Sequence, residues 1–401
     1  MSQPASANNA SNDRIEQFKL LTQCAPGTEM GKLLRKFWHP VALSRSLEAG
    51  QAKSLRILGE DLTLYRGASG KAHLIGGRCA HRRSVLNTGK IIGEEIRCHY
   101  HGWQYNGTGQ CTRRPAEKDP GLPNVRIAGY PVHEYFGLVF AWMGEGPAPE
   151  FDLPRRAAFE KPGALVVALE EHWDCNWFQQ IENSLDAVHV SFAHQGFWVG
   201  PFGEAVSEDI PDLSYAETDA GLEQTALRPG ATVSVRKSNW NFPNNNYINV
   251  PGLTKDAPWI DISVFAVPND DENGTRFFLW STQSTTPEAD RHFLDHFAKF
   301  GDYQAPAHHD ELFHKRIYPD PEDILVGLTF AQDYVAVRGQ GRIADREDEL
   351  LGISDMGIVT LRRLFWRELG LQREGMPTKQ WKRLAVSTVA PPEKKKETAR
   401  A

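Results

Sequence analysis

Between Val41 and Gly146 the chain alternates apolar and polar residues in short runs that are separated by glycine-containing turns. The runs include SLRILGEDLTLYRG, KAHLIGGRC and YFGLVFAWMG. Alternation with a period of two, interrupted by turn signals at short intervals, is typical of antiparallel strands. We therefore predict a small all-β domain, a barrel or a sandwich, with its loops at the strand ends.

The pattern changes after a proline-containing stretch, Pro147 to Pro162, which is typical of a linker. A helix is predicted over residues 170–194, where Trp173, Trp177 and Ile181 recur every four residues. Further helical patterns and strand-like runs alternate up to the C-terminal region, which indicates a mixed domain. The predicted strands cover residues 223–235, 240–250, 259–267 and 275–285, and the predicted later helices cover residues 288–300, 330–337 and 358–369.

The two ends of the chain differ from the middle. Residues 1–14 are rich in Ser, Asn and Ala, and the last residues are highly charged, so both are expected to be disordered. A helical pattern, broken at 25–27, leads into the first strand. The predicted division is an N-terminal arm and helix over 1–40, the all-β domain over 41–146, a second domain over 147–390 and a tail over 391–401.

Composition narrows the function. The 401 residues carry a formal net charge of -6 and are 40% hydrophobic, which is enough for two domains and argues against nucleic acid as a partner. The start of the chain lacks the apolar region of a secretory signal, and the longest apolar run, Tyr135 to Met143, is too short to span a membrane. Five cysteines, an odd number, suggest no disulfide framework. We therefore expect a cytoplasmic location.

The most informative motif is a pair of mixed ligand clusters, Cys79-x-His81 and Cys98-x-x-His101, with sixteen residues between them. Two thiolates on one iron and two imidazoles on the other are the ligands of a Rieske [2Fe–2S] cluster. A structural zinc site is the alternative, but zinc ligands usually come in like pairs, C-x2-C or H-x3-5-H. The mixed pairs favour the Rieske cluster.

The residues around these ligands indicate the kind of Rieske protein. Ser84 and Tyr100 stand where the high-potential type has two disulfide-bonded cysteines, and Trp103 replaces a serine that donates to the cluster. Tyr105 matches a tyrosine that donates towards a cluster sulfur. Fewer donors imply a lower potential, which is the pattern of Rieske oxygenases and their ferredoxins. Arg83 stands where oxygenases usually have glycine, a change that can alter a docking surface.

A second set of candidate ligands is Asn183-x-x-Asp186-x-x-His189-x4-His194. Two imidazoles and one carboxylate form the facial triad of non-haem Fe(II) oxygenases, and Asp333 in FAQDYVAV is one of many acids that could supply the carboxylate. The alternative is that the two histidines are ordinary core residues. Asp186 could orient His189 through its ring N–H or carry an electron to the site, and Asn183 would be a nearby amide.

Taken together, the chain resembles the oxygenase (alpha) component of Rieske non-haem iron aromatic-ring-hydroxylating oxygenases over nearly its whole length. It is most similar to the phthalate 4,5-dioxygenase group, with vanillate-type O-demethylases next. The resemblance is carried by LLTQCAPGTEMGKLLRKFWHP, CAHRR…CHYHGWQYNGTGQC, ENSLDAVHVSFAH and AQDYVAVRGQGRIADREDELLGISDMGIVTLRR. It implies an α+β fold, in which an N-terminal all-β Rieske domain precedes a helix-grip (START-like) catalytic domain with an antiparallel sheet.

The resemblance also implies site residues. Cys79, His81, Cys98 and His101 would bind the [2Fe–2S] cluster, and His189, His194 and Asp333 would bind a mononuclear Fe(II). Asp186 would bridge His101 of one subunit and His189 of the next in a head-to-tail trimer or a stack of two trimers, because the distance within one subunit would be too long. Asp186 and Asn183 are therefore the predicted catalytic residues.

The expected reaction is hydroxylation of a small, carboxylated aromatic substrate with O2. No flavin or nicotinamide motif is present, so electrons from NADH must come through a separate reductase. Asn183, where phthalate dioxygenases commonly have glycine, leaves an O-demethylating monooxygenase as the alternative, and a stand-alone Rieske electron carrier is the alternative from another class. The predicted pocket strands are 232–250 and 259–267, where Arg228, Arg236 or Lys237 could pair a carboxylate or be surface charges.

Overall fold

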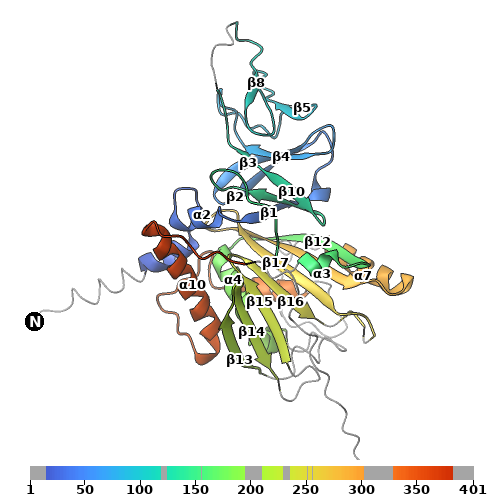
Figure 1. The fold of residues 1–401 in the computed structure, drawn as a ribbon, viewed down its shortest axis with the longest axis vertical. Coiled ribbons are helices and arrows are strands. Elements are labelled where there is room, and N and C mark those ends of the chain that lie inside the picture. Colours follow the sequence, from blue (N-terminus) through green and yellow to red (C-terminus); the bar gives the residue numbers. More distant parts are fainter. Residues whose placement is uncertain are drawn as a thin grey trace, which may run out of the picture. The chain divides into compact units, whose positions relative to one another are not determined.

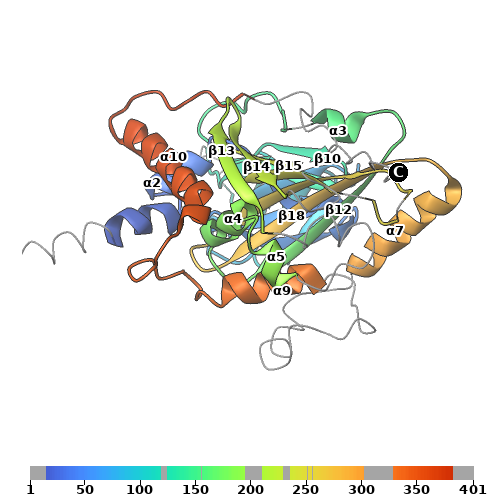
Figure 2. The same ribbon diagram turned by 90° about the horizontal axis from the view of Figure 1, so that it is seen from below.

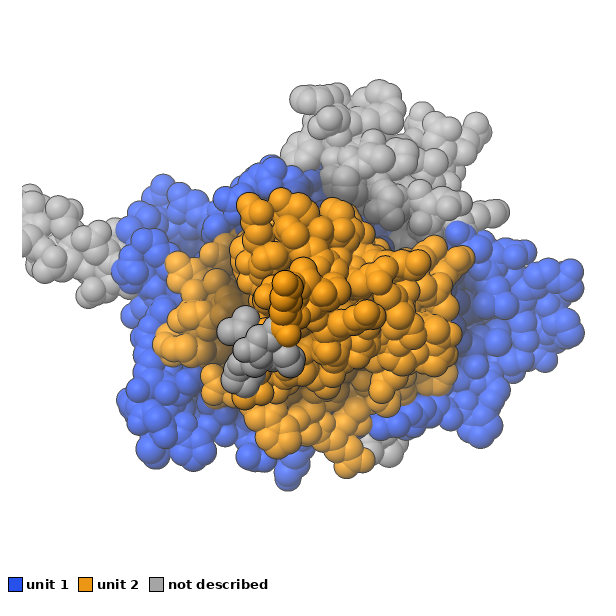
Figure 3. All heavy atoms as spheres, turned by 90° about the horizontal axis from the view of Figure 1, so that it is seen from above, with its two compact units in different colours: residues 1–22, 152–266, 272–401 blue, residues 23–151, 267–271 orange. Residues whose placement is uncertain are grey.

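The computed structural model describes residues 15–118, 124–154, 156–194, 210–228, 235–250, 252–254, 256–301 and 328–382. The two segments that were expected to be disordered, 1–14 and 391–401, lie outside these residues. The chain divides into two compact units (Figure 3). Unit 1 consists of residues 1–22, 152–266 and 272–401, and unit 2 consists of residues 23–151 and 267–271.

Unit 2 is built almost entirely from short strands (Figure 1). Among the described residues of this unit there is one α-helix, α2 (Glu29–Leu34), which is capped by Thr28, whose hydroxyl accepts a hydrogen bond from the Gly31 N–H. The short antiparallel strands predicted from the alternation are confirmed. The first sheet contains β1 (Trp38–Leu43), β11 (Leu138–Trp142) and β10 (Val132–Tyr135); the second contains β2 (Ala52–Ile57), β3 (Glu60–Arg66), β4 (Ala72–Gly76) and β9 (Gly129–Tyr130); the third contains β5 (Lys90–Ile92), β6 (Glu95–Arg97), β7 (Gln104–Tyr105) and β8 (Cys111–Arg113).

Most of the apolar run from Tyr135 to Met143 forms the buried strand β11, and the run begins at Tyr135, the last residue of β10. Strands β10 and β11 pair antiparallel across a turn at Phe136 and Gly137, both of which have positive φ angles of 41° and 82°. Glycine adopts this conformation without steric cost, and Phe136 adopts it as well, so the two residues together reverse the chain.

Unit 1 contains a seven-stranded sheet in the order β12-β18-β17-β16-β15-β14-β13. Several helices accompany it, and residues 15–22 are helical as well. The strands are β12 (Ala164–Trp173), β13 (Asp212–Glu217), β14 (Gly221–Leu227), β15 (Val235–Asn241), β16 (Asn245–Val250), β17 (Ile260–Pro268) and β18 (Gly274–Gln283). The helices are α3 (Arg156–Glu160), α4 (Trp177–Leu185), α5 (Val190–Ala193), α7 (Pro287–Gly301), α9 (Leu328–Arg338), the short 3-10 helix η3 (Ile353–Asp355) and α10 (Met356–Arg373).

The predicted helix over 170–194 is wrong at its start. Its first four residues complete β12, which pairs with β18 along all ten of its residues and ends with Trp173 opposite Gly274. Large apolar residues can be buried by a strand as well as by a helix, so the spacing of the tryptophans does not decide between the two. The hydrogen bonds along the whole β12–β18 ladder favour the strand. Helix α4 begins only at Trp177. The side chain of Asn176, just before it, caps the helix by accepting a hydrogen bond from the Phe178 N–H. Strands β12 and β13 were missed, and helix α3 lies in the predicted linker.

Another predicted strand, over 240–250, is two strands. Strand β15 ends at Asn241, β16 begins at Asn245, and the turn between them contains the Phe242–Pro243 bond. A proline lacks the N–H that a central strand needs, so the turn follows from the sequence. The predicted helices over 288–300, 330–337 and 358–369 are confirmed as α7, α9 and α10.

One face of the large sheet carries the main core of unit 1. Side chains two apart along a strand share a face. On this face Leu169, Ile262, Phe278 and other apolar residues form one cluster with Phe293 and Phe297 of α7. Each fully buried side chain of this size stabilises the fold by about 1.5–3 kcal/mol. Helix α9 contacts both α4 and α5, and these helices lie over the same side of the sheet (Figure 2).

Within the described residues, every helix is too short or too polar to span a bilayer.

Candidate metal and cluster sites

Two neighbouring loops of unit 2 hold the four candidate cluster ligands. Cys79 and His81 follow β4, and Cys98 and His101 lie between β6 and β7. Both cysteines are 2% exposed, and both belong to one buried cluster. The ring centroids of the two histidines are 4.5 Å apart. The structure therefore brings together two buried sulfurs and two adjacent imidazoles, which fits the donor set of a Rieske cluster.

Backbone hydrogen bonds close each loop around its cysteine. The Cys79 N–H donates to Ser84 O at 2.9 Å, and the Cys98 N–H donates to Trp103 O at 2.8 Å. Gly102 has a φ angle of 77°, and a Cβ atom there would lie 2.8 Å from Pro115 Cγ. Only glycine fits this position without a shift of the proline ring. The loops are thus shaped by residues within a few positions of the ligands.

Tyr105 reaches the cluster site from β7. Its hydroxyl oxygen accepts a hydrogen bond from the Ala80 N–H at 3.0 Å and lies 3.2 Å from Cys79 Sγ. Because that oxygen already accepts from the backbone, its own hydrogen is available for the sulfur. Burial and the neighbouring sulfur raise the pKa of Tyr105, which keeps it protonated. Arg83 has a φ angle of 59°, in the left-handed region that favours glycine.

The imidazole edge of the cluster site reaches the surface of unit 2. The ring of His81 is exposed and stacks on Trp103 with the planes 5° apart. Tyr100, 53% exposed, packs against His101. Partial burial, with the nearby His81 and Arg82, lowers the pKa of His101 and favours the neutral, ligating form. This edge is where an electron can leave the cluster.

In unit 1, three candidate ligands converge from α5 and α9. His189 precedes α5 and His194 follows it, so one helical turn separates them. The Nε2 atoms of both histidines lie 3.2 Å from the same oxygen, Oδ1 of Asp333. The three ligand atoms all lie within 4.8 Å of one another. Two imidazole nitrogens and one carboxylate oxygen around a common point fit the facial triad of a non-haem Fe(II) site.

The charges of these groups are strongly coupled. Burial lowers the pKa of His189, but the carboxylates of Asp186 and Asp333 outweigh it and raise that pKa to about 9. Burial likewise opposes ionisation of Asp333, yet His194 and His189 hold its pKa well below the usual value. A carboxylate held negative beside two imidazoles is what a divalent cation needs.

Asp186 occupies the corner between α4 and α5. Its Oδ1 accepts from the backbone N–H of Val188 at 2.8 Å and of His189 at 3.2 Å, and its Oδ2 lies 3.7 Å from His189 Nδ1. The carboxylate thus touches the non-ligating side of the imidazole. The other predicted residue, Asn183, donates through Nδ2 to Asp333 Oδ1 at 3.5 Å. The structure therefore brings both next to the three candidate ligands.

Gln332 is a residue that the sequence reasoning missed. Its Oε1 lies 2.9 Å from Nδ1 of His194, which leaves Nε2 of that ring directed at Asp333. An amide oxygen at Nδ1 accepts the ring N–H and so selects the tautomer that can bind a metal through Nε2. In the sequence, only its position next to Asp333 could have pointed to Gln332, and that position alone was not enough to select it.

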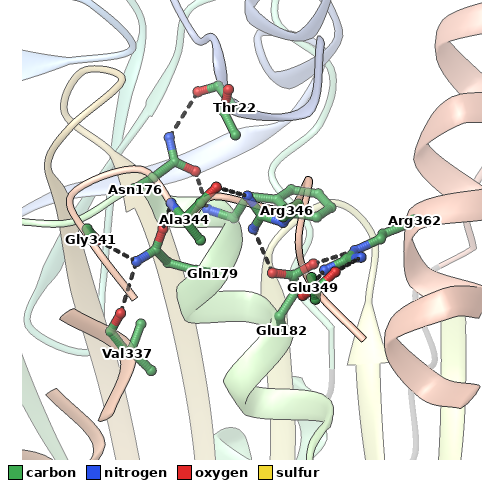
Figure 4. A network of polar contacts seen from close by, with 11 residues as sticks. Thr22, Asn176, Gln179, Glu182, Val337, Gly341, Ala344, Arg346, Glu349 and Arg362 are labelled. Atoms are coloured by element: carbon green, nitrogen blue, oxygen red, sulfur yellow. Dashed lines mark hydrogen bonds and ion pairs between the residues drawn. The ribbon is translucent and has the colours of Figure 1, made fainter. Parts of the chain in front are cut away.

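A polar network holds α4 in position (Figure 4). Glu182, 7% exposed, accepts from Arg346 and from Arg362, each at 2.6 Å. One turn earlier, Gln179 donates to the carbonyl oxygens of Val337 and Gly341, both at 2.9 Å. The segment after α9 thus wraps α4, the helix that ends at Asp186.

The three candidate ligands line a cavity of about 130 Å³. Its walls are the even-numbered residues of β16, β17 and β18 on the core face, which include Ile248, Ile262, Phe278 and Trp280. The predicted pocket strands therefore contribute, although residues 232–234 lie outside the described residues. Of the candidate cations, Arg236 lines the cavity, whereas Lys237 is paired with Glu223 at 2.6 Å.

Comparison with known proteins extends over both units. A model of the Rieske [2Fe-2S] domain matches residues 37–131. The oxygenase subunit of 5,5'-dehydrodivanillate O-demethylase from a Sphingobium species is 31% identical over 367 residues, covering 88% of this chain and 80% of that subunit. The oxygenase subunit of phthalate 4,5-dioxygenase from Pseudomonas putida is 28% identical, covering 90% and 87%. The solved structure of Pseudomonas putida NdmA with caffeine shares the fold at a TM-score of 0.64 and 19% identity, covering 93% of this chain and 100% of that one.

Proposed function

Because this chain belongs to the Rieske non-haem iron aromatic-ring-hydroxylating oxygenases, as their oxygenase component, we propose a role for each residue at its two sites. The chain is an oxidoreductase that uses O2 to hydroxylate an aromatic substrate. Its cofactors are a Rieske [2Fe–2S] cluster and a mononuclear iron. The observation that carries the assignment of the reaction site is the convergence of His189, His194 and Asp333 at the wall of an apolar cavity.

We assign the cluster to unit 2 and the mononuclear iron to unit 1. When bound, the cluster passes on single electrons and the mononuclear iron activates O2 beside the substrate. The fit of the donor atoms described above supports both assignments. The ligands assigned to the cluster are Cys79, His81, Cys98 and His101, and those assigned to the iron are His189, His194 and Asp333.

The remaining residues hold and orient these ligands. Gln332 keeps the ring of His194 in the tautomer that presents Nε2, and Tyr105 donates to Cys79 Sγ. Asp186 accepts the N–H groups of the turn before α5 and faces His189 Nδ1, so its charge acts directly on a ligand. We assign to Asp186 the passage of electrons to the iron site. Asn183, close to Asp333, is placed to hydrogen-bond to a polar group of the substrate or of O2.

The electrons come from a separate protein, a reductase or a ferredoxin, and a reductase that oxidises NADH is our finer proposal. The exposed imidazole edge of unit 2 supports transfer between chains, since it allows another molecule to approach. We infer a head-to-tail trimer, or two stacked trimers, in which the cluster of one subunit serves the iron of the next. None of the five cysteines, all within the described residues, forms a disulfide, which supports our proposal of a cytoplasmic location.

Two outcomes of the reaction remain as proposals: hydroxylation of the ring, and hydroxylation of a methyl ether that then releases formaldehyde. The similarity to an O-demethylase subunit supports the second outcome as the alternative, and so does Asn183 at a position where phthalate dioxygenases commonly have glycine. A stand-alone electron carrier is not supported, because the relatives that cover most of the chain are oxygenase subunits.

The test is turnover under ¹⁸O-labelled O2 with a surrogate reductase and NADH. The panel contains phthalates, phenoxybenzoates and methoxybenzoates, and products are followed by mass spectrometry and a formaldehyde assay. A diol with both labelled atoms identifies a ring dioxygenase, and formaldehyde with an unlabelled phenol identifies an O-demethylase. If the fully loaded protein neither consumes O2 nor binds any of these compounds, the proposed function is wrong.

A further inference from the structure

We propose that Asn246 accepts a hydrogen bond from a hydroxyl or amino group of the substrate, so that the cavity selects aromatic rings that carry such a donor. This inference rests on the proposed function, because it places the substrate in the cavity that the three candidate iron ligands line. It adds a specificity-determining residue and the kind of ring substituent that the site recognises.

The first support is the position of Asn246 on the sheet. It lies in β16, opposite Val264 of β17 and two residues before Ile248. Side chains opposite each other in a ladder and those two apart along a strand share a face. Because Val264 and Ile248 both line the cavity, Asn246 faces it as well, and it lines the cavity together with Asn183 and Asp186.

The second support is a buried polar atom of this side chain. Asn246 is 6% exposed, and its Nδ2 donates to Ser184 O at 3.2 Å. A carbonyl oxygen can only accept, so the amide nitrogen has to face Ser184, and this fixes the position of Oδ1. That Oδ1 is buried and has no hydrogen-bond partner among the described residues. A buried acceptor without a partner is unfavourable, and a ligand that donates to it removes this penalty.

The groups around Asn246 favour a donor over an anion. The carboxylates of Asp186 and Asp333 line the same cavity, and Ser184, the partner of Asn246, lies two residues before Asp186. Asp186 is not one of the candidate iron ligands, so its charge remains when a metal is bound. Acceptor oxygens and negative charge attract an O–H or N–H group and repel an ionised oxygen.

A neighbouring asparagine of the same strand provides an internal comparison. Asn245 points to the other face of the sheet, where its Nδ2 donates to Ser263 Oγ at 2.7 Å and its Oδ1 accepts from Asn241 at 2.9 Å. Both ends of that amide are therefore used within the sheet. Asn246 has a protein partner only at its nitrogen. The difference matches a structural role for Asn245 and a ligand-binding role for Asn246.

The size of the cavity sets the rest of the ligand. Its volume is about 130 Å³, and an apolar cavity of about 150 Å³ holds benzene. One ring can thus lie against Ile248, Ile262 and Phe278 while its substituent donates to Asn246. Since Asn246 is bonded to α4, the helix that leads to Asp186, this hydrogen bond also sets which part of the ring faces the candidate iron ligands.

The experiment varies one ring substituent in the protein loaded with both metals. The probes are 3-methoxybenzoates that carry a hydroxyl, amino, methyl or fluoro group, para to the carboxylate in one series and meta to it in a second. Anaerobic calorimetric titration gives dissociation constants without turnover, and KM is then measured with O2. In at least one series the hydroxyl and amino compounds should bind about five- to hundredfold more tightly, because the methyl and fluoro compounds leave a buried acceptor unpaired.

Three variants connect this preference to Asn246. Asn246→Leu removes the acceptor at similar volume, and it should abolish the preference by weakening the binding of the hydroxyl and amino compounds alone. Asn246→Asp keeps an acceptor oxygen and should retain the preference. Asn249→Leu is the matched control, because Asn249 lies on the other face of the same strand, donates to Asp261 Oδ1 at 2.9 Å and does not line the cavity. It should behave like the wild type.

Two results would overturn the inference: equal binding of all four substituents by the wild type in both series, or an unchanged preference in Asn246→Leu. The wild-type series alone decides the question if the Asn246→Leu protein does not fold. Equal binding and oxidation of all four compounds would leave the oxygenase function standing, whereas failure to bind or oxidise any of them would count against both.

Discussion

The two sites of this protein are built in opposite ways. In unit 2, the four candidate ligands come from two loops within 23 residues of sequence, and backbone hydrogen bonds close each loop around its cysteine. In unit 1, the three candidate ligands come from two segments far apart in the sequence, since Nε2 of His189 and of His194 each lie 3.2 Å from Asp333 Oδ1. The cluster site is therefore a local structure, whereas the iron site exists only when α4, α5 and α9 are packed together.

This difference has a physical consequence. A local site depends on turns, on Gly102 and on Tyr105, and it tolerates changes elsewhere in the chain. A site assembled from distant helices depends on the contacts that hold those helices, above all the pairs of Glu182 with Arg346 and Arg362. Its charges are also coupled, since His189 interacts with both Asp186 and Asp333. The two sites should therefore fail separately and for different reasons.

The largest effect is expected for a substitution of Asp333, which should abolish the iron site and leave the cluster site intact. Asp333→Ala removes the carboxylate that both histidines face, so the mononuclear iron should be lost and turnover should fall at least about a thousandfold. The visible absorption and the inorganic sulfide of the cluster should stay unchanged, because its ligands lie in unit 2. Metal analysis and spectroscopy measure both. Asp295→Ala, on the exposed side of α7, is the control, and loss of the cluster in Asp333→Ala would contradict the separation.

The second prediction tests the dependence of the iron site on distant packing. Glu182→Ala leaves two buried guanidinium groups without their shared carboxylate, which should lower the free energy of unfolding by about 3–5 kcal/mol. Thermal unfolding measured by circular dichroism gives this value. Glu349→Ala, which removes a more exposed partner of Arg362 alone, should cost clearly less. Equal losses for the two variants would show that the burial of Glu182 is not what matters.

The third prediction concerns the connection between the sites. Asp186→Asn keeps the side-chain oxygen that accepts from the turn but removes the charge that faces His189. Both metals should remain bound, while turnover should fall on the order of a hundredfold or more, because a positioned charge in a site of this kind contributes that much. Steady-state assays on metal-quantified protein give the answer. Full activity would exclude Asp186 as the path for electrons.

The smallest effect is expected for Gln332. Replacing a residue that orients a metal-binding histidine usually lowers metal affinity by about 10–100-fold. Gln332→Ala should therefore release iron faster to a chelator, while Gln332→Glu, which can still accept the ring N–H of His194, should retain most of the affinity. No change in Gln332→Ala would show that His194 is held by its neighbours alone.

The same contrast explains how much could be predicted from the sequence. The α+β fold with an all-β Rieske domain is confirmed, and the cluster ligands followed from their spacing because they are neighbours in the chain. His189 and His194 could be recognised as a pair, but Asp333 could be selected only through the family resemblance. Gln332 and Glu182 were not found at all, since their importance lies in contacts between segments far apart in the sequence. The roles of the site residues stay predictions until the variants are measured.

The central claim is that the two sites work as one enzyme, and a single-turnover experiment tests it most directly. The cluster is reduced beforehand, the protein is mixed with O2 and an aromatic acid, and cluster oxidation is followed by absorbance while product is quantified. We predict that the cluster is oxidised in step with product formation in the wild type and stays reduced in the iron-free Asp333→Ala variant. Equally fast oxidation in both proteins, without product, would contradict the account.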